Sequence, residues 1–257
     1  MFQFVVLATV LAVASAGTVI GPIRGIGSSP IVGGTEASIQ DAPWQVALQY
    51  NGGLRCGGSI IRATVILTAG HCTTGTSAGA WNVRAGSSQH ASGGASYKVA
   101  TVVTNSQYNS NTLDYDIAVL KLSSAISIDN LNTRLIPLPA SGLDVATGAS
   151  ALVTGWGTTS SGGSIPATLR KVTLPVVSQA DCVSAYSGFN TVTARMICGG
   201  RLGVGGVDAC QGDSGGPFVV NGVIVGVTSW GNGCALARYP GVWARVPALV
   251  TWINAQL

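Results

Sequence analysis

Short apolar or alternating runs, separated by Gly, Ser, Asn and Pro, make up most of this chain. Runs of this kind bounded by turn formers are typical of β-strands. They cover Gln45–Tyr50, Ser59–Ile61, Val65–Ala69, Ile117–Leu122, Ala151–Thr154, Val172–Leu174, Phe218–Val220, Val223–Ser229 and Val242–Val246. Because strands do not alternate with helical patterns, a parallel sheet is not expected. The pattern predicts an all-β protein, and 36 glycines in this context favour a barrel or a sandwich.

One hairpin and two helices complete the predicted elements. Asn221-Gly222 between two valine-rich runs is a strong hairpin signal. A short helix is expected to start at Ser178, where Asp181 three residues later resembles a capping box. A longer helix is expected at the end of the chain, with Pro247 in its first turn. Its apolar face is formed at helical spacing by Leu249, Trp252, Ile253 and Gln256/Leu257.

The remaining segments are expected to be connections. Asp129–Gly148 is rich in Asn, Pro, Ser and Gly, lacks strong periodicity and could link two halves of the chain. Ser161–Ser164 and Gly203–Gly206 have the composition of surface loops.

The composition indicates a folded, secreted protein. Hydrophobic residues make up 47% of the chain and charged residues 9%, which excludes a disordered chain. No apolar run reaches the roughly 18 to 20 residues of a membrane-spanning helix. Phe2–Ala16 is apolar and ends in Ala14-Ser15-Ala16, a small-x-small cleavage pattern, so we interpret residues 1–16 as a signal peptide. A buried N-terminal strand or helix is the alternative.

Cysteine and charge narrow the classes further. Six cysteines in a secreted chain predict three disulfides, for which the sequence alone allows about fifteen pairings. A zinc site is not expected, because no CxxC pair occurs and the chain has only two histidines. The net charge of +4 is scattered, so binding to nucleic acid or to an anionic membrane is not indicated.

Candidate groups for nucleophilic catalysis are few. His71 follows an apolar run and precedes Cys72, whereas His90 lies in a stretch of loop composition. The candidate nucleophile is Ser214, in Gly212-Asp213-Ser214-Gly215-Gly216-Pro217. Flanking glycines allow a tight turn and leave N–H groups free to face a developing oxyanion. Alone, a glycine-rich serine turn is a weak signal.

The same segment matches G-x-S-x-G, the nucleophile elbow of α/β-hydrolases. In that fold the acid and the histidine follow the serine along the chain. No histidine follows Ser214, whereas the order His71, Asp116, Ser214 is that of chymotrypsin. The elbow reading is therefore disfavoured.

From Ile31 to Leu257 the sequence resembles the chymotrypsin family, trypsin subgroup. Six motifs carry the resemblance in the order typical of that family: Ile31-Val32-Gly33-Gly34, Leu67-Thr68-Ala69-Gly70-His71-Cys72, Asp116-Ile117-Ala118-Val119-Leu120, Gly155-Trp156-Gly157, Asp208-Ala209-Cys210-Gln211-Gly212-Asp213-Ser214-Gly215-Gly216-Pro217 and Ser229-Trp230-Gly231. The resemblance implies a serine endopeptidase that needs no cofactor and no metal.

It also implies the catalytic roles. Ser214 would be the nucleophile, His71 the base and Asp116 the orienting acid. Asp114 is the rival acid, because two residues apart on a strand point to the same side; the Asp-Ile-Ala-Val-Leu match favours Asp116. The N–H groups of Gly212 and Ser214 would form the oxyanion hole.

For substrate binding, the resemblance places Asp208, six residues before the nucleophile, at the floor of the specificity pocket. A buried carboxylate favours a cationic side chain, so cleavage after Arg or Lys is expected. Other implied pocket residues are Ala209, Gln211, Ser229, Trp230, Gly231 and Gly241. Ala209 stands where many trypsins have serine, and loss of that hydroxyl is expected to favour Arg over Lys.

The resemblance implies a fold of two six-stranded antiparallel β-barrels packed together, with the active site between them and a C-terminal helix. The expected divisions are a propeptide at 17–30, an N-terminal barrel at 31–136 and a C-terminal barrel at 137–257. The implied disulfides are Cys56–Cys72, Cys182–Cys198 and Cys210–Cys234.

Activation is expected to pair a freed Ile31 amine with Asp213. The sequence departs from its relatives at Pro30, where most have Arg or Lys. Our hypothesis is a cut after Arg24 and later removal of Gly25–Pro30. A second departure is Gly86–His90, which matches the calcium loop of vertebrate trypsins but has no carboxylate, so calcium dependence through it is not expected.

The expected partners are protein or peptide substrates and protein protease inhibitors, and the expected state is a secreted, extracellular monomer. Two other functions stay open on the sequence. One is a catalytically inactive protease homologue that acts as a binding protein, although no triad member is missing. The other is a β-sandwich adhesion module with incidental motifs.

Overall fold

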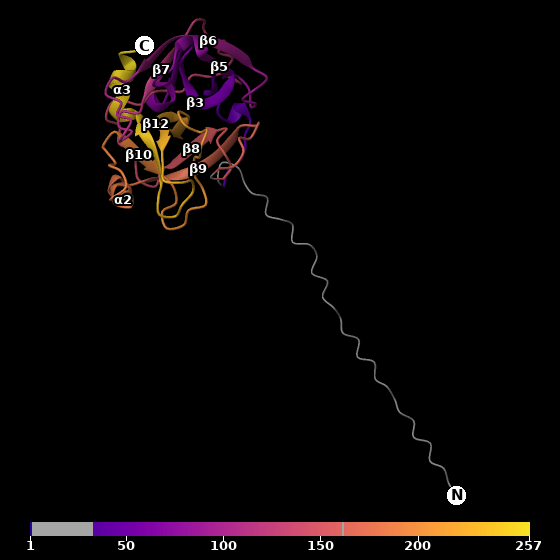
Figure 1. Cartoon of the computed structure of the whole chain (residues 1–257), viewed down its shortest axis with the longest axis vertical. Helices are drawn as coiled ribbons and strands as arrows, with labels where there is room; N and C mark the ends of the chain where they lie inside the picture. Colours follow the sequence, from indigo (N-terminus) through magenta and orange to yellow (C-terminus); the bar gives the residue numbers. More distant parts are fainter. Residues whose placement is uncertain (2–32, 161) are drawn as a thin grey trace.

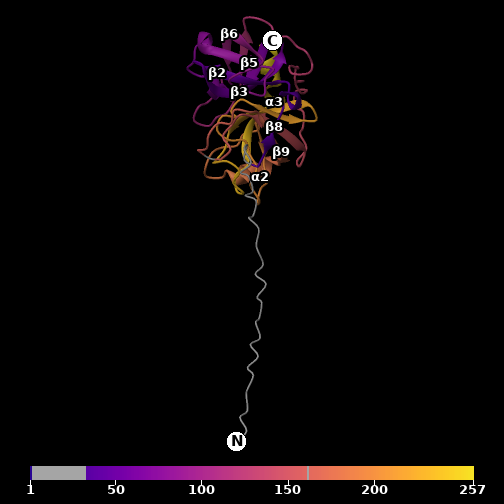
Figure 2. The same ribbon diagram turned by 90° about the vertical axis from the view of Figure 1, so that its right-hand side faces the viewer.

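Two closed, six-stranded antiparallel β-barrels form the body of the protein. A computed structural model describes Met1, residues 33–160 and residues 162–257. The barrels lie one above the other, with the earlier part of the chain in the upper barrel of both views (Figures 1 and 2). The two-barrel fold implied by the resemblance is confirmed.

The first barrel closes in the order β2-β3-β4-β7-β6-β5, with β5 paired back to β2. Its strands are β2 (Gln45–Tyr50), β3 (Gly53–Arg62), β4 (Val65–Thr68), β5 (Trp81–Ala85), β6 (Ala95–Thr104) and β7 (Ala118–Leu122). The predicted runs in this half each overlap a strand. We did not predict β5 and β6; in β6 only Val99 is buried, so a hydrophobic pattern is largely missing.

The second barrel closes in the order β8-β9-β10-β13-β12-β11 through the pairing of β8 with β9. Its strands are β8 (Ser150–Gly155), β9 (Arg170–Val177), β10 (Met196–Gly199), β11 (Pro217–Val220), β12 (Val223–Trp230) and β13 (Gly241–Arg245). A two-residue strand, β1 (Thr35–Glu36), adds to the edge of β9. Residues 123–149 join the barrels without a strand or helix. The boundary at 136/137 stays a prediction.

The predicted hairpin turn joins β11 to β12. Asn221 and Gly222 both have positive φ, 49° and 77°, as a type I′ turn requires. This prediction from the dipeptide is confirmed.

Helices are few and short: α1 (Gly70–Thr73), α2 (Gln179–Ala185), α3 (Val246–Asn254) and the 3₁₀ turns η1 (Ile39–Asp41) and η2 (Ala78–Ala80). The Ser178 hydroxyl caps α2 by accepting from the Asp181 amide at 3.0 Å. In α3, Leu249 and Ile253 are buried as predicted. Leu257 was assigned wrongly to that face, because the helix ends before it and its side chain is 43% exposed. None of the helices in the described ranges is long and apolar enough to cross a membrane.

The barrels share a continuous apolar core. Leu249 and Ile253 of α3 belong to the same buried cluster as Ile66 and Leu67 of the first barrel and Val227 of the second. Three disulfides brace the periphery: Cys56–Cys72 joins β3 to α1, Cys182–Cys198 joins α2 to β10, and Cys210–Cys234 joins two loops of the second barrel. Apolar packing therefore contributes to the docking of the two barrels.

A buried hydrogen bond between two side chains joins β2 of the first barrel to β8 of the second. The Thr154 hydroxyl on β8 donates to Oε1 of Gln45 on β2 at 2.7 Å, and the Gln45 side chain has no solvent exposure. A buried amide oxygen without a donor costs its full desolvation energy. The bond therefore couples the two barrels.

We expect Thr154→Val to lower the free energy of unfolding by about 1–3 kcal/mol, because Gln45 Oε1 loses its donor away from water. Gln45→Leu combined with Thr154→Val removes both partners and should recover most of that loss. Urea unfolding of the two proteins measures the difference. A double variant no more stable than Thr154→Val alone would contradict the explanation.

Candidate active site

His71 and Asp116 form a hydrogen-bonded pair in the first barrel. His71 is the second residue of α1, and Asp116 ends the loop between β6 and β7. Asp116 Oδ2 lies 2.7 Å from Nδ1 of His71, and its Oδ1 accepts the His71 amide at 2.7 Å. An ionised carboxylate can only accept, so Nδ1 carries the proton and Nε2 is left as the basic nitrogen.

Asp116 is buried, at 1% exposure, but is well supplied with donors. Its third donor is the hydroxyl of Ser229 on β12, at 2.5 Å from Oδ2. Because β12 belongs to the second barrel, this contact fixes the carboxylate of one barrel against a strand of the other. Sequence reasoning assigned Ser229 to substrate binding; the geometry adds this contact with the carboxylate.

Asp114, the rival acid, points elsewhere. Its two oxygens accept from Nε of Arg195 at 2.9 Å and from Nη2 of Arg195 at 2.5 Å. The expectation that Asp114 and Asp116 share one side assumed an extended strand. Tyr115, between them, has φ +53°, which turns the chain and sends the two carboxylates apart. The strand assumption was therefore wrong.

Ser214 lies in the loop that precedes β11, where this loop touches the first barrel. Its carbonyl accepts the amide of Gly57 on β3 at 2.8 Å. The next residue, Gly215, has φ +77°, and a Cβ there would lie 2.6 Å from the Gly57 carbonyl oxygen. Only glycine allows this close approach. The serine turn is thus seated on the barrel that carries His71 and Asp116.

The residues before the serine form a tight turn. Gly212 has φ +98°, a backbone conformation that side chains rarely adopt. The side chain of Asp213 points inward, where Oδ1 accepts the Gly157 amide at 2.8 Å and Oδ2 the Cys210 amide at 2.9 Å. Burial raises the pKa of Asp213 to about 6, although both amides oppose the shift. Ile31, its predicted partner, lies outside the described residues.

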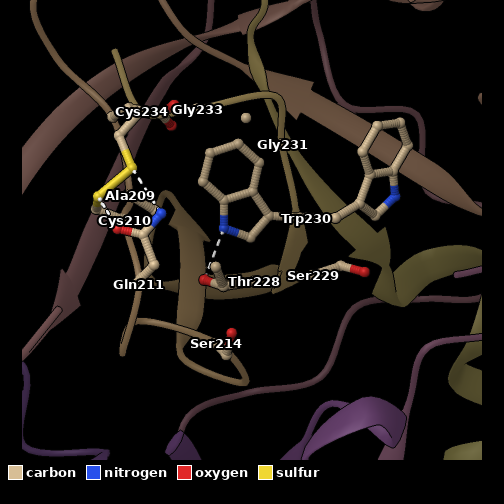
Figure 3. A pocket seen from close by; sticks show the side chains of 13 residues that line it. Ala209, Cys210, Gln211, Ser214, Thr228, Ser229, Trp230, Gly231, Gly233 and Cys234 are labelled. Carbon is tan, nitrogen blue, oxygen red and sulfur yellow. Dashed lines mark hydrogen bonds between the residues drawn. A yellow bond between two sulfur atoms is a disulfide. The ribbon is translucent and has the colours of Figure 1, made fainter. Parts of the chain in front are cut away.

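A cavity of about 180 Å³ extends from Ser214 into the second barrel (Figure 3). It is lined by Asp208, Ala209, Cys210, Gln211, Ser214, Thr228, Ser229, Trp230, Gly231, Gly233, Cys234, Gly241 and Trp243. All the predicted pocket residues are among them. Thr228, Gly233 and Trp243 were missed, because neither a motif nor a charge marks them in the sequence. In the close-up, Gln211 lies along the Cys210–Cys234 disulfide, whose Cys234 sulfur accepts its amide at 3.4 Å.

Asp208 is the charged group of this cavity. The residue is 4% exposed, and its Oδ2 accepts the Ala235 amide at 3.1 Å. Its Oδ1 is buried and has no hydrogen-bond partner among the described residues. Burial raises the pKa of Asp208 to about 7 in the empty cavity, against the effect of two backbone amides. An unpaired buried carboxylate oxygen is a site for a cation.

Glycine keeps the space beside this carboxylate open. A Cβ on Gly241 would lie 2.5 Å from Asp208 Oδ1 and 2.6 Å from the Trp243 ring. A Cβ on Gly231 would meet only ordinary contacts, the nearest at 3.5 Å. A side chain at position 231 would therefore be compatible with the fold, but it would reduce the volume of the cavity.

One group of potential metal ligands occurs in the described ranges: Cys56, His71 and Cys72. Both sulfurs are bonded to each other, which leaves a single imidazole. This group therefore offers no set of ligands for a metal ion.

Comparison with known proteins places the chain in a family. The trypsin family model matches residues 31–253. The chain is 44% identical to trypsin delta of Drosophila melanogaster over 98% of each chain. It is 46% identical to trypsin Blo t 3 of Blomia tropicalis over 88% of this chain and 85% of that protein. Trypsin alpha-4 of Lucilia cuprina is 46% identical over 87% of this chain and 86% of that protein.

We expect benzamidinium, a small planar cation, to bind in the cavity with an affinity that falls as the pH is lowered. Asp208 must be ionised to pair with it, so a pKa near 7 predicts that Kd rises about tenfold from about pH 8 to about pH 6. Calorimetry on His71→Ala measures this without interference from the imidazole. Asp208→Asn should bind weakly at every pH; a flat profile for His71→Ala would contradict the prediction.

Proposed function

The chain belongs to the trypsin family of serine endopeptidases, and from that premise we propose that it cuts peptide chains after arginine and, less efficiently, after lysine. The observation that carries this proposal is the buried Oδ1 of Asp208, which has no hydrogen-bond partner among the described residues and belongs to a residue that lines the same cavity as Ser214. A guanidinium would supply two parallel donors to the carboxylate, and ion pairing would restore its ionised form.

The proposed chemistry uses Ser214, His71 and Asp116. Ser214 Oγ attacks the peptide carbonyl carbon while Nε2 of His71 takes its proton. The negative charge that forms on the carbonyl oxygen is held by the amides of Gly212 and Ser214. His71 then gives the proton to the leaving amine, the C–N bond breaks, and water hydrolyses the acyl-enzyme by the same route. Asp116 holds the imidazole in the required tautomer, a role supported by its contacts with His71 and Ser229.

We further propose that the protein is made as a secreted zymogen. Residues 1–16 would be the signal peptide and 17–30 the propeptide, and three disulfides fit an extracellular enzyme. The new α-amine of Ile31 would pair with Asp213, because a positive charge would stabilise the ionised form of this buried carboxylate. Because Pro30 rather than Arg or Lys precedes Ile31, the proposed route is a cut after Arg24 followed by removal of Gly25–Pro30 by another peptidase. Finding Gly25 at the N-terminus of fully active enzyme would contradict that route.

The direct test of function is turnover by the processed enzyme of matched peptide amides with arginine, lysine or phenylalanine before the cleaved bond. The arginyl and lysyl amides should be hydrolysed and the phenylalanyl amide should not. In Ser214→Ala, kcat should fall by about 10⁶-fold, as for loss of the serine from other triads. Preference for the phenylalanyl substrate would refute the assigned specificity, and absence of any turnover with intact Ser214 would indicate the inactive homologue.

A second prediction concerns Ala209, whose methyl group lies in the cavity beside Asp208. An ammonium needs more acceptors than one carboxylate offers, so Ala209→Ser should raise kcat/KM for lysyl substrates by about tenfold, the value of one hydrogen bond to a charged group. Arginyl substrates should change less. The exposed Ala91→Ser is the matched control. Equal kcat/KM for lysyl and arginyl substrates in the parent enzyme would be the contrary result.

A further inference from the structure

An ion pair joins the two barrels two residues before Asp116. Asp114, in the loop between β6 and β7, accepts both Nε and Nη2 of Arg195, which immediately precedes β10 of the second barrel. The side chains are 14% and 31% exposed, so water only partly screens the pair. A two-point guanidinium–carboxylate contact fixes direction as well as distance.

Further contacts connect the same two segments. The Thr193 hydroxyl donates to Asp114 Oδ1 at 2.9 Å, and the side-chain amide of Asn190 donates to the Thr112 carbonyl at 3.2 Å. The Arg195 guanidinium also lies over the Tyr115 ring, 4.5 Å from its centroid. We call this set of contacts between residues 112–115 and 190–195 the inter-barrel clamp.

The clamp holds a loop in an unfavourable backbone conformation. Leu113 and Tyr115, on either side of Asp114, have φ of +57° and +53°. A residue other than glycine rarely adopts this conformation, and it persists only where surrounding contacts hold it. Asp114 lies between the two, and its contacts with Arg195 and Thr193 help to hold this turn against the second barrel.

The other end of the clamp is anchored in the second barrel. The carbonyl of Arg195 accepts the amide of Arg245, at the end of β13, at 2.7 Å. The neighbouring Met196 begins β10, which pairs with β13. Arg195 therefore transmits the position of the second barrel to the loop that carries Asp116.

We propose that Asp114 and Arg195 are positioning residues of the catalytic site: the clamp holds the Leu113–Tyr115 turn against the second barrel and so keeps the Asp116 carboxylate aligned with His71. The proposal rests on the roles assigned to His71 and Asp116 under the proposed function. It gives Asp114 a purpose other than that of a rival acid.

The pair also has an electrostatic consequence. Burial opposes ionisation of Asp114, but the hydrogen bonds from Arg195 and Thr193 outweigh it and lower the pKa of this carboxyl. The ion pair is thus neutral overall. The charged or titratable groups near the His71–Asp116 pair are Tyr108, whose pKa is affected by the charge of Asp116, and Arg55, whose Nε donates to the carbonyl of Cys72 beside His71. The Asp114–Arg195 pair lies two residues from Asp116 along the chain. Burial and the charge of Asp116 raise the pKa of Tyr108 to about 12, so it is neutral at working pH.

The test compares processed parent enzyme with Asp114→Asn, Arg195→Gln and the double variant. All three should lose about tenfold in kcat on an arginyl amide, because a loosened Asp116 misaligns the base. Their Kd for benzamidinium should stay unchanged, because the specificity cavity is not touched. A purely structural loss would lower the melting temperature without this division between kcat and binding.

The pH profile of kcat/KM gives the second measurement. Arg195→Gln leaves the Asp114 charge unpaired and should move the acid limb of this profile to higher pH, because a nearby negative charge favours a protonated base. Asp114→Asn leaves the Arg195 charge unpaired and should move the limb down by a similar amount. The double variant should return the limb to the parent position while kcat stays low, which separates alignment from charge.

Two controls protect the reading. Lys171→Gln breaks an exposed ion pair with Asp41 and should change neither quantity. Arg195→Lys should recover the pH profile but only part of kcat, because an ammonium cannot make the two-point contact. The clamp proposal is overturned if the parent hydrolyses substrate and labels at Ser214 with an organophosphate, yet the clamp variants keep parental kcat. A parent that neither turns over nor labels refutes the proposed function instead.

Discussion

Removal of carboxylates from water is the constraint on which the site depends. Asp116, Asp208 and Asp213 are all buried, and each solves the problem of lost hydration differently. Asp116 has three donors and remains ready to orient an imidazole. Asp213 has two backbone amides and a raised pKa, so an added positive charge would stabilise it. Asp208 keeps one oxygen with no partner among the described residues, and a ligand cation can supply the missing donors. The number of donors thus distinguishes the three carboxylates and fits the different roles proposed for them.

The second requirement is that the two barrels dock in one arrangement. His71 and Asp116 come from the first barrel, whereas Ser214, Ser229 and the cavity come from the second. Neither barrel contains all of these groups, so small changes in docking would change the distances between them. The apolar cluster that both barrels share contributes attraction without a preferred direction. Direction comes from a few polar bridges, namely Gln45–Thr154, Asp116–Ser229, Gly57–Ser214 and Asp114–Arg195.

Much of this was predictable from the sequence, and the misses have physical causes. Strands with an apolar face, such as β2 and β12, carried a readable pattern, and Asn221-Gly222 specified its turn through φ alone. Strand β6 was missed because only Val99 is fully buried, and Tyr97, Val102 and Val103, which pack partly exposed against the core, do not alternate regularly along the strand. The direction of Asp114 was missed because it depends on a positive φ at Tyr115, which neighbouring residue types do not reveal. Local sequence thus indicated the candidate residues, while tertiary contacts decided where their side chains point.

Glycine is what allows carboxylates to be buried so close to the backbone. A Cβ on Gly155 or Gly157 would lie 2.1 Å or 2.3 Å from the oxygens of Asp213, and one on Gly241 would lie 2.5 Å from Asp208. A side chain at Gly155 or Gly157 would overlap the carboxylate of Asp213, and one at Gly241 would occupy the space in which a cation could reach Asp208. The amide of Gly157 is itself a donor to Asp213, so the same residue both clears the space and stabilises the charge. Gly155, Gly157 and Gly241 are therefore required because they lack a side chain. The steric clash of a Cβ at these distances would cost far more than any gain in strand propensity could offset.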